Sequence, residues 1–238
     1  MIEKNKSSKV LGLIPARSGS KELPGKNTKI FAGKELIGWT IEAAKKSKVI
    51  DRVVVSTDCK NIAEISEKFG AEIPFIRPVE LATDNSSSTD VIMHTLSNID
   101  NVDYVILLQP TSPLRTAVDI DLAFHGMLQS NAKSCVSLTL SKSSPYIMYK
   151  LNEQSKVKNI VSDAKSYTRR QDFPQSYELN GALYISDINS FKENQSFISN
   201  DTFGYIMDAE KSHDIDNFED FLTAEASFEI LKNKKGNC

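Results

Sequence analysis

Short apolar runs and amphipathic stretches alternate along the first part of the chain. Five apolar runs predict strands, at residues 10–14, 52–56, 71–76, 104–108 and 135–140. Apolar positions at helical spacing between them predict helices over residues 36–48, 62–69, 89–98 and 118–129. This alternation predicts an α/β fold with a mostly parallel sheet flanked by helices, and it places function at the carboxyl ends of the strands.

The pattern changes after about residue 141. Two runs predict a strand pair at residues 145–151 and 156–160. Short strands at residues 182–185 and 204–207 follow, and then a helix over residues 218–231 that is capped by Asp216 or Asn217. We expect a single domain over residues 1–238, with a small β-rich insert at about residues 141–175 that serves as a lid, a dimerisation arm, or both.

Polar side chains follow four of the predicted strands. A basic loop follows the strand that ends at residue 14, Asp58 follows the second strand, and Arg77 follows the third. The strand that ends at residue 108 is followed by Gln109, Thr111, Ser112 and Arg115. In a doubly wound sheet these segments meet in one crevice, so the sequence predicts a single site there.

The loop LIPARSGSKELPGKN, residues 13–27, holds the cations Arg17, Lys21 and Lys26 among glycines and prolines. Glycines let backbone N–H groups approach an anion, and a cation about 4 Å from a phosphate oxygen gains roughly 4 kcal/mol at an effective dielectric near 20. The loop lacks the G-x-x-x-x-G-K-[ST] and G-x-G-x-x-G patterns, which weakens the P-loop ATPase and dinucleotide interpretations. A polyphosphate fits it best; a solvated basic surface loop is the alternative.

The segment SHDIDNFED carries Asp214 and Asp216 two positions apart. In an extended segment their side chains share one face and could hold Mg²⁺ through carboxylate oxygens. Helix capping by a surface acidic run is the alternative. A nucleoside triphosphate carries about four negative charges, and a metal would let carboxylates approach it without net repulsion, so the basic loop favours the metal interpretation.

Composition and charge exclude several classes of protein. The 238 residues include 29 basic and 31 acidic side chains, so no overall field attracts nucleic acid or an anionic membrane. No apolar segment is long enough to span a bilayer. The cysteines Cys59, Cys135 and Cys238 form no C-x-x-C pair, which argues against a disulfide framework or a zinc site. We expect a cytoplasmic protein that binds neither nucleic acid nor membrane.

Six ordered motifs resemble the CMP-sialic acid synthetases, or acylneuraminate cytidylyltransferases. They are PARSGSKELPGKN, STD, RPVELATDNSSSTD, LLQPTSPLR, RRQDFPQSYELNGALYI and DID, and they span about residues 10–225. The resemblance implies a Rossmann-like nucleotidyltransferase fold and a homodimer. It also implies an enzyme that uses Mg²⁺ (or Mn²⁺) and CTP to convert a nine-carbon keto-sugar acid, a nonulosonic acid, into its CMP derivative with release of pyrophosphate.

The same resemblance implies roles for individual residues. It implies nucleotide binding by Ala16, Arg17, Ser20, Lys26, Asn27, Arg77, Ser86 and Ser88. It implies catalytic roles for Arg17, Lys21, Lys26, Asp214 and Asp216, the last two as metal ligands. It implies contacts with the sugar acid for Gln109, Arg170, Tyr184 and Phe197. Tyr184 and Phe197 fit a hydrophobic core equally well.

One difference from the family pattern leaves the identity of the sugar acid undecided. Sialic acid enzymes carry a sugar-contacting lysine after the proline near residue 145, where this chain has Tyr146 and Ile147. A legionaminate, pseudaminate or Kdo enzyme, or another sugar nucleotidyltransferase, is therefore the nearest alternative. A metal-dependent glycosyltransferase and a nucleotide-binding regulatory module are the more distant ones. Asp214, Asp216 or a metal-bound hydroxide could accept the proton of the attacking hydroxyl.

Overall fold

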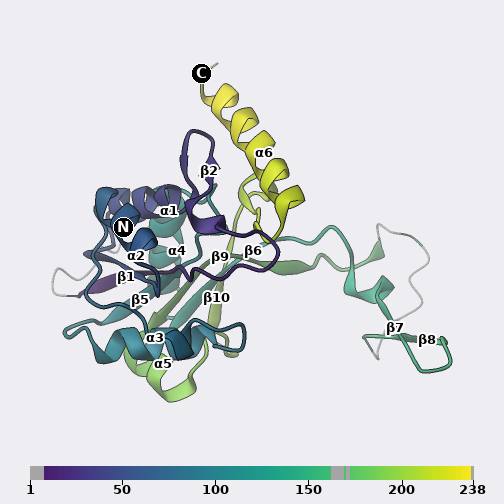
Figure 1. The fold of residues 1–238 in the computed structure, drawn as a ribbon. Helices are drawn as coiled ribbons and strands as arrows, with labels where there is room; N and C mark the ends of the chain where they lie inside the picture. Colours follow the sequence, from purple (N-terminus) through teal and green to yellow (C-terminus); the bar gives the residue numbers. More distant parts are fainter. Residues whose placement is uncertain (1–7, 162–168, 170–171, 237–238) are drawn as a thin grey trace.

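Six strands form the central sheet of the protein, in the order β10-β6-β9-β5-β1-β4 (Figure 1). The structure is a computed structural model and describes residues 8–161, 169 and 172–236. The strands are β1 (Val10–Pro15), β4 (Arg52–Ser56), β5 (Tyr104–Leu108), β6 (Ser134–Leu140), β9 (Tyr177–Asp187) and β10 (Thr202–Ile206). β1, β4 and β5 are buried along nearly all of their length, which explains their continuous apolar runs.

The predicted mostly parallel sheet is confirmed. β1 pairs in parallel with β4 and β5, and β10 pairs in parallel with β6, whereas β9 runs antiparallel between β5 and β6. The short strand predicted at residues 182–185 is the inner part of β9, which is 11 residues long. The outer part of β9 begins with three exposed residues, so its sequence lacks the apolar run that marks the inner part.

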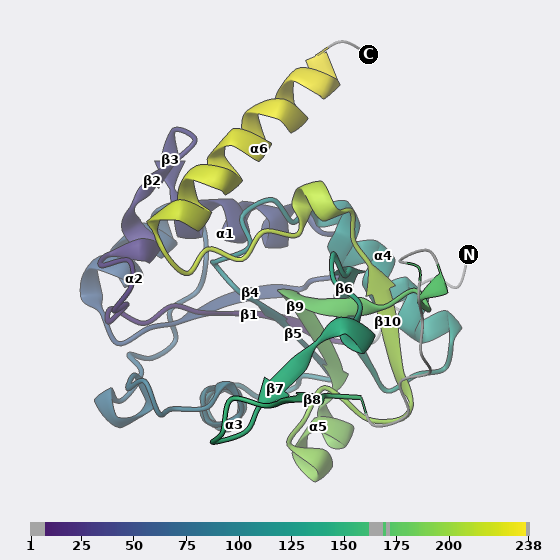
Figure 2. The ribbon, with the colours of Figure 1, turned by 90° about the vertical axis from the view of Figure 1, so that its right-hand side faces the viewer.

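Helices cover both faces of the sheet (Figure 2). α1 (Leu36–Lys46), α2 (Lys60–Lys68) and α4 (Ala117–Gln129) pack on one face, where Ile41 and Phe124 are fully buried. α3 (Ser88–Ser97) and α5 (Ile188–Asn194) pack on the other face through Ile92 and Phe191. None of the helices in the described ranges has the length and apolar character needed to cross a membrane.

Local signals in the sequence fix several helix ends. The side chain of Ser87 accepts a hydrogen bond from Asp90 N while the Asp90 carboxylate accepts from Ser87 N, which makes a capping box at α3. The last helix, α6 (Phe218–Gly236), starts after Asn217, whose Oδ1 accepts hydrogen bonds from two backbone N–H groups of the first turn. Asn217, rather than Asp216, is therefore the cap, and α6 runs five residues past the predicted end at residue 231.

The predicted strand at residues 71–76 is wrong. This segment makes one isolated bridge, from Glu72 to Val54, and otherwise has no strand structure. Pro74 has no N–H to donate to a ladder, and the side chain of Ile76 is 50% exposed, so the segment cannot extend the sheet beyond the edge strand β4. The apolar pattern alone did not separate this stretch from a true strand.

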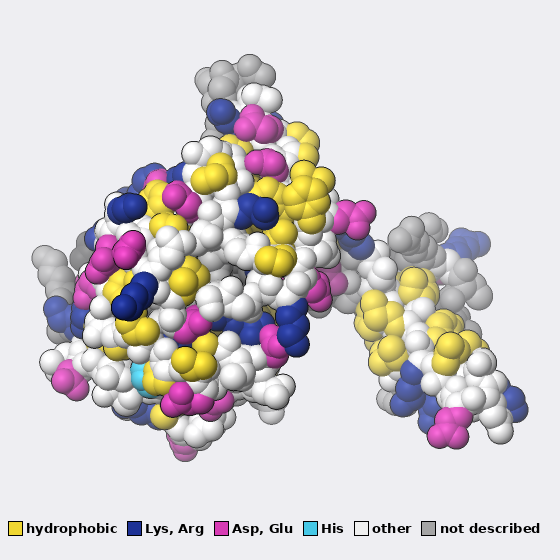
Figure 3. All heavy atoms as spheres, in the orientation of Figure 1, with side chains coloured by type: hydrophobic (Ala, Val, Ile, Leu, Met, Phe, Trp, Pro, Cys, Tyr) yellow, Lys and Arg dark blue, Asp and Glu magenta, His cyan; other side chains and the backbone are white. Residues whose placement is uncertain are grey.

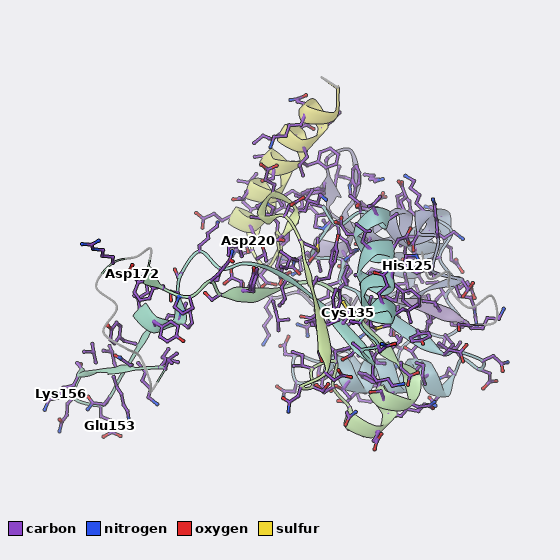
Figure 4. The ribbon with its side chains drawn as sticks, turned by 180° about the vertical axis from the view of Figure 1, so that it is seen from behind. His125, Cys135, Glu153, Lys156, Asp172 and Asp220 are labelled. Carbon is purple, nitrogen blue, oxygen red and sulfur yellow. The ribbon has the colours of Figure 1, made fainter. Side chains whose placement is uncertain are left out.

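An arm projects from the body of the molecule (Figure 1). It contains the 3-10 helix η3 (Pro145–Ile147) and a two-stranded sheet of β7 (Tyr149–Leu151) and β8 (Val157–Asn159), so the predicted strand pair is present but shorter. Figure 4 shows Glu153 and Lys156 at its outer end, far from His125 in the body. A second small sheet, β2 (Ile30–Phe31) with β3 (Lys34–Glu35), follows the basic loop.

Candidate active site

A cavity of about 280 Å³ opens where the basic loop meets the carboxyl ends of β1 and β5. We call it the basic cavity. Seven of the eight residues predicted to bind nucleotide line it: Arg17, Ser20, Lys26, Asn27, Arg77, Ser86 and Ser88. Segments that are far apart in the sequence therefore converge, as the topology of an open α/β sheet predicts.

Hydrogen bonds hold the basic loop in place. Gly25 has a φ of +68°, which favours glycine, and the 3-10 helix η1 (Lys26–Thr28) begins directly after it. The buried amide of Asn27 donates a hydrogen bond of 3.0 Å to the carbonyl oxygen of Arg17, which ties the two ends of the loop together. Asp58 accepts hydrogen bonds from both the backbone N–H and the hydroxyl of Ser18, at 2.9 and 2.6 Å.

The two ends of the chain meet at Lys26. Its ammonium donates a hydrogen bond of 2.6 Å to the carbonyl oxygen of Ile215 and lies 3.2 Å from Asp216 Oδ1. Ile215 is fully buried, and its N–H donates to the carbonyl oxygen of Thr111, so the segment that carries both acids is fixed against the β5 loop. The acidic pair and the basic loop therefore share one site.

Asp214 lies beside Gln109, next to a required glycine. Gly181 in β9 has a φ of +71°, and a Cβ atom there would be 3.1 Å from Asp214 Oδ2 and 3.6 Å from Gln109 Oε1. Solvent still reaches Asp214, but crowding of its carboxylate by protein atoms raises its pKa, and the charge of Asp216 acts in the same direction. A hydrogen bond with Thr111 opposes this rise.

Arg77 brings unused hydrogen-bond donors to the basic cavity. The residue is 4% exposed, and its Nε and Nη2 have no hydrogen-bond partner among the described residues. Burial lowers the pKa of its guanidinium, and the nearby Asp58 carboxylate opposes this shift. Both atoms are shielded from solvent just behind the cavity surface, so a ligand with acceptor oxygens or ring nitrogens would pair with them after a small shift of this wall.

Asp84 is a site residue that sequence reasoning missed. Its carboxylate lies 2.7 Å from Arg17 Nη1 and 2.5 Å from Lys21 Nζ, and it lines the basic cavity. The two cations hold the pKa of Asp84 below its usual range. Lys21 itself points to solvent and reaches the cavity wall only through Asp84. The motif RPVELATDNSSSTD contains Asp84, but nothing in its spacing marks that aspartate as a partner of the loop.

A second cavity, also of about 280 Å³, adjoins the first. We call it the aromatic cavity. Gln109, Tyr184 and Phe197, three of the four residues predicted to contact the sugar acid, line it together with Ser88. The rings of Tyr184 and Phe197 are 5.5 Å apart, and Thr111 Oγ1 donates a hydrogen bond of 3.3 Å to Gln109 Oε1. Gln109 and Ser88 belong to the linings of both cavities, so the two form one continuous site.

Three sequence predictions have a different outcome. The side chain of Ala16 is buried outside the two linings, and its N–H donates to the carbonyl oxygen of Ser56. Arg170 lies outside the described residues, so its predicted contact stays a prediction. Arg115, which we expected at the same strand end, turns to the other side of the loop, where Nη1 donates to the carbonyl oxygens of Gln109 and Ala182.

The acidic pair suits a divalent cation that is bound together with a phosphate. The described residues contain no group of three or more His, Cys, Asp or Glu side chains that could hold a metal unaided. Mg²⁺ usually takes one or two carboxylates and completes its six oxygens with water and substrate phosphate. Asp214 and Asp216, beside a basic cavity, match that donor set.

The sequence model of the cytidylyltransferase family matches residues 11–234. This chain belongs to the cytidylyltransferase family. A cytidylyltransferase needs a nucleotide site, and the basic cavity lies at the carboxyl ends of parallel strands, where such sites occur.

Curated relatives are similar over most of the chain. An N-acylneuraminate cytidylyltransferase of Escherichia coli is 37% identical over 91% of this chain, which spans 51% of that relative's length. A CMP-N,N'-diacetyllegionaminic acid synthase of Legionella pneumophila is 35% identical, and the match covers 93% of this chain and 97% of that relative's length. A pseudaminic acid cytidylyltransferase of Campylobacter jejuni is 31% identical, with 93% and 97% covered. The chain thus spans about half the length of some relatives and nearly all of others.

Solved structures share the fold at low sequence identity. A CMP:2-keto-3-deoxy-manno-octonic acid synthetase complexed with CTP superposes with a TM-score of 0.71 at 19% identity, covering 94% of this chain and all of that one. A 4-diphosphocytidyl-2C-methyl-D-erythritol synthase of Anaerococcus prevotii gives a TM-score of 0.66 at 14% identity, with 94% and 97% covered. The predicted Rossmann-like nucleotidyltransferase fold is confirmed.

Proposed function

We propose that this cytidylyltransferase moves CMP from CTP to the anomeric hydroxyl of a nonulosonic acid, N-acetylneuraminate or a relative of it, and releases pyrophosphate. The observation that carries the proposal is the junction of the basic and aromatic cavities at Gln109 and Ser88. A nucleotide in the first cavity and a sugar acid in the second would meet there, next to Asp214.

The basic cavity provides separate contacts for each part of the nucleotide. Arg17, Ser20 and Lys26 hold the triphosphate, because charge-assisted hydrogen bonds suit phosphate oxygens. Asn27 shapes the loop from within. The free N–H groups of Arg77 recognise the acceptors of the cytosine ring. Ser86 and Ser88 face the ribose.

The aromatic cavity provides the sugar site. Gln109 is held by the hydroxyl of Thr111 and presents its amide to sugar hydroxyls. Phe197 packs on the buried Phe191, with ring centroids 4.8 Å apart, and offers an apolar wall for an acyl group. Burial raises the pKa of Tyr184, so its hydroxyl stays protonated and can donate a hydrogen bond. Arg170 is proposed to pair with the substrate carboxylate.

In the reaction, the anomeric oxygen of the sugar acid forms a bond to the α-phosphorus of CTP, and the proton of its hydroxyl passes to a nearby base, Asp214 or Asp216. The bond from that phosphorus to the bridging oxygen breaks, and pyrophosphate leaves. Positioning and neutralisation of charge supply most of the catalysis in such transfers. Arg17 and Lys26, which line the basic cavity, stabilise the charge that collects on the leaving pyrophosphate, and Lys21 adds its positive charge from outside the lining.

We propose Mg²⁺ as the metal, with Asp214 and Asp216 as its protein ligands. Held by these carboxylates, Mg²⁺ would neutralise phosphate charge and would lower the pKa of the attacking hydroxyl. The carboxylates hold their places without it, because Ile215 between them is anchored through its N–H to Thr111 and through its carbonyl oxygen to Lys26. Activity is expected to disappear with EDTA and to return with Mg²⁺ or Mn²⁺.

The deciding experiment measures pyrophosphate release from CTP and Mg²⁺ with a panel of N-acetylneuraminic, legionaminic, pseudaminic and Kdo acids. Release with one acid, and not with ATP, GTP or UTP in place of CTP, supports the proposal and identifies the sugar. Release of a nucleoside diphosphate from a nucleotide sugar would indicate a glycosyltransferase. CTP binding without turnover of any acid would indicate a regulatory module and contradict the proposal.

We also propose that the chain is a single domain that forms a homodimer through the arm. Apolar side chains gather on the face of the arm that is seen in Figure 3. The exposed apolar residues of the arm are Ile147, Met148, Tyr149, Leu151, Val157 and Ile160. A two-stranded sheet is marginally stable alone, and an apolar surface of this kind usually has a partner. A second copy of the chain is the partner that closed symmetry favours.

A further inference from the structure

A third cavity, of about 460 Å³, lies between α1, the start of α4 and α6. We call it the α6 cavity. It shares no lining residue with the basic or aromatic cavity. Its walls are largely apolar and come from Trp39, Ala43, Pro113, Leu114, Ala117, Val118, Phe228 and Leu231. Its charged lining residues are Glu42, Lys46, Arg115, Lys211 and Lys232.

The charges around the α6 cavity favour an anion. Among the described residues, Glu42 is the one acid of the lining, against four cations, and it is paired with Lys34 at 2.6 Å and Lys46 at 3.1 Å. Lys211 and Lys232 have carboxylates outside the lining nearby, Asp119 at 3.2 Å and Glu229 at 4.0 Å. Asp119, just behind the lining, accepts hydrogen bonds from its own capping box and from Lys211, so its oxygens are also in use. The N-terminal turn of α4, which includes Ala117 and Val118, adds the positive end of a helix dipole.

Arg115 is the second, independent indication of a ligand. It is 2% exposed, and Nε and Nη2 find no hydrogen-bond partner in the part of the chain that the structure describes. Burial lowers the pKa of Arg115 to about 9, so its guanidinium is still charged at neutral pH. Both donor atoms are closed off from solvent, so an anion in the adjoining cavity would offset the cost of the buried charge through space and not by a direct hydrogen bond to them.

The apolar wall indicates what else the ligand carries. The ring of Trp39 packs edge-on against Phe228, with centroids 4.6 Å apart, and Leu231 continues the surface along α6. An aromatic or branched apolar body fits such a wall.

We propose that the α6 cavity is an effector site for an organic anion with an apolar or aromatic body and one carboxylate, sulfonate or phosphate group. Arg115 connects this site to the catalytic residues. Its Nη1 donates to the carbonyl oxygen of Gln109, the residue before Pro110, and to the carbonyl oxygen of Ala182, the residue after Gly181. Gly181 in turn lies against Asp214. An anion that attracts the guanidinium therefore acts on both sides of the reaction centre.

The test uses 8-anilinonaphthalene-1-sulfonate, an aromatic monoanion, as the probe. Trp39 is the single tryptophan of the chain and lines the α6 cavity, so its fluorescence reports on this site. We expect saturable quenching of Trp39 by the probe, and saturating CTP should not displace it. This binding measurement does not depend on the proposed function.

Two variants on α4 make a matched pair. Val118→Glu adds a negative charge at the cavity wall, where the side chain is 62% exposed, and should weaken probe binding at least about fivefold. Leu122→Glu adds the same charge one turn further along, at a 54% exposed position outside the lining, and should leave binding unchanged. Neither residue lines the catalytic cavities, so both variants should keep the basal rate of pyrophosphate release.

The kinetic arm measures pyrophosphate release with increasing probe. We expect kcat to change in the wild type and in Leu122→Glu but not in Val118→Glu. Equal probe binding in the two variants, or displacement of the probe by CTP, would overturn the site. Bound probe without any change in kcat would overturn its effector role. A change of oligomeric state in Val118→Glu alone would show instead that a second copy of the chain covers this cavity.

Discussion

Lys26 Nζ lies 3.2 Å from Asp216 Oδ1, although the two residues are 190 positions apart in the chain. The same ammonium donates to the carbonyl oxygen of Ile215, so one side chain links the basic loop to the segment that carries both acids. This contact brings the candidate phosphate-binding group and the candidate metal ligands to one point.

Replacing Lys26 with alanine should therefore lower kcat/KM for CTP. Loss of one charge-assisted hydrogen bond to the departing pyrophosphate costs about 1.5 to 3 kcal/mol, or roughly 10- to 150-fold in rate. Steady-state pyrophosphate release measures the effect. Lys29→Ala, three positions along and outside the cavity lining, is the matched control and should retain activity. A Lys26→Ala enzyme as fast as the wild type would remove this residue from the mechanism.

We expect Asp84 to compete with phosphate for the loop cations. Its carboxylate is paired with Arg17 and Lys21, so a phosphate group that binds these two cations would displace it. Asp84→Asn should make pyrophosphate a stronger product inhibitor, with an inhibition constant about two- to fivefold lower, as expected for an exposed ion pair. Inhibition assays at two salt concentrations measure this change.

Glu80→Gln is the control for Asp84→Asn. Glu80 is an exposed acid of the same segment and lies outside the cavity lining. Its removal should leave the inhibition constant unchanged. If pyrophosphate instead binds more weakly to Asp84→Asn than to the wild type, Asp84 supports the phosphate site and does not compete with it.

Phe197→Ala should weaken the binding of the sugar acid without weakening the binding of CTP. The ring forms part of the aromatic cavity, which is distinct from the basic cavity except at its shared wall. We expect KM for the sugar acid to rise at least about fivefold, because a lost apolar contact in a pocket is worth about 1 to 3 kcal/mol. KM for CTP should not change. Phe218→Ala, an exposed aromatic of α6, controls for general effects, and an equal rise in both KM values would contradict the assignment.

The arm can be tested through one cross-strand pair. Leu151 and Val157 face each other across β7 and β8, and their side chains are 65% and 70% exposed. Leu151→Lys with Val157→Lys should convert the proposed dimer into a monomer, which light scattering measures as half the mass. The adjacent pair Lys150 and Lys158 gives the control, Lys150→Ser with Lys158→Ser, which should remain dimeric.

Much of the fold follows from hydrophobic periodicity. The buried strands β1, β4 and β5 were predicted because their residues face apolar neighbours on both sides of the sheet. Residues 71–76 have similar composition, yet Pro74 and the edge position prevent pairing. β9 was predicted at less than half its length, since its outer part is exposed, mixes polar and apolar residues, and is held by pairing with β6. Long-range pairing of this kind leaves no periodic signal.

In the candidate site, too, some residues could be predicted from local sequence, and others depend on long-range contacts. The loop cations and Gln109 were predicted because charges and amides directly after strands have few structural reasons to occur there, and Asp214 and Asp216 because they lie two positions apart. Asp84 was missed because its role depends on the distance to Arg17, which is 67 positions away in the chain. Arg115 was placed with the strand-end cluster, but its side chain takes the opposite direction to bind the carbonyl oxygens of Gln109 and Ala182. Side-chain direction at a loop is set by tertiary contacts that spacing does not encode.

β9 is one continuous strand from its exposed start at Tyr177 to the middle of the sheet, and Gly181 lies on the way. The pairing of β9 with β6 changes register around this glycine, although the backbone of the strand is continuous through it. A displacement of the strand's outer end would be transmitted along the backbone to the glycine that touches Asp214. Assembly of the arm with a neighbour would thereby also set the geometry of the reaction chamber.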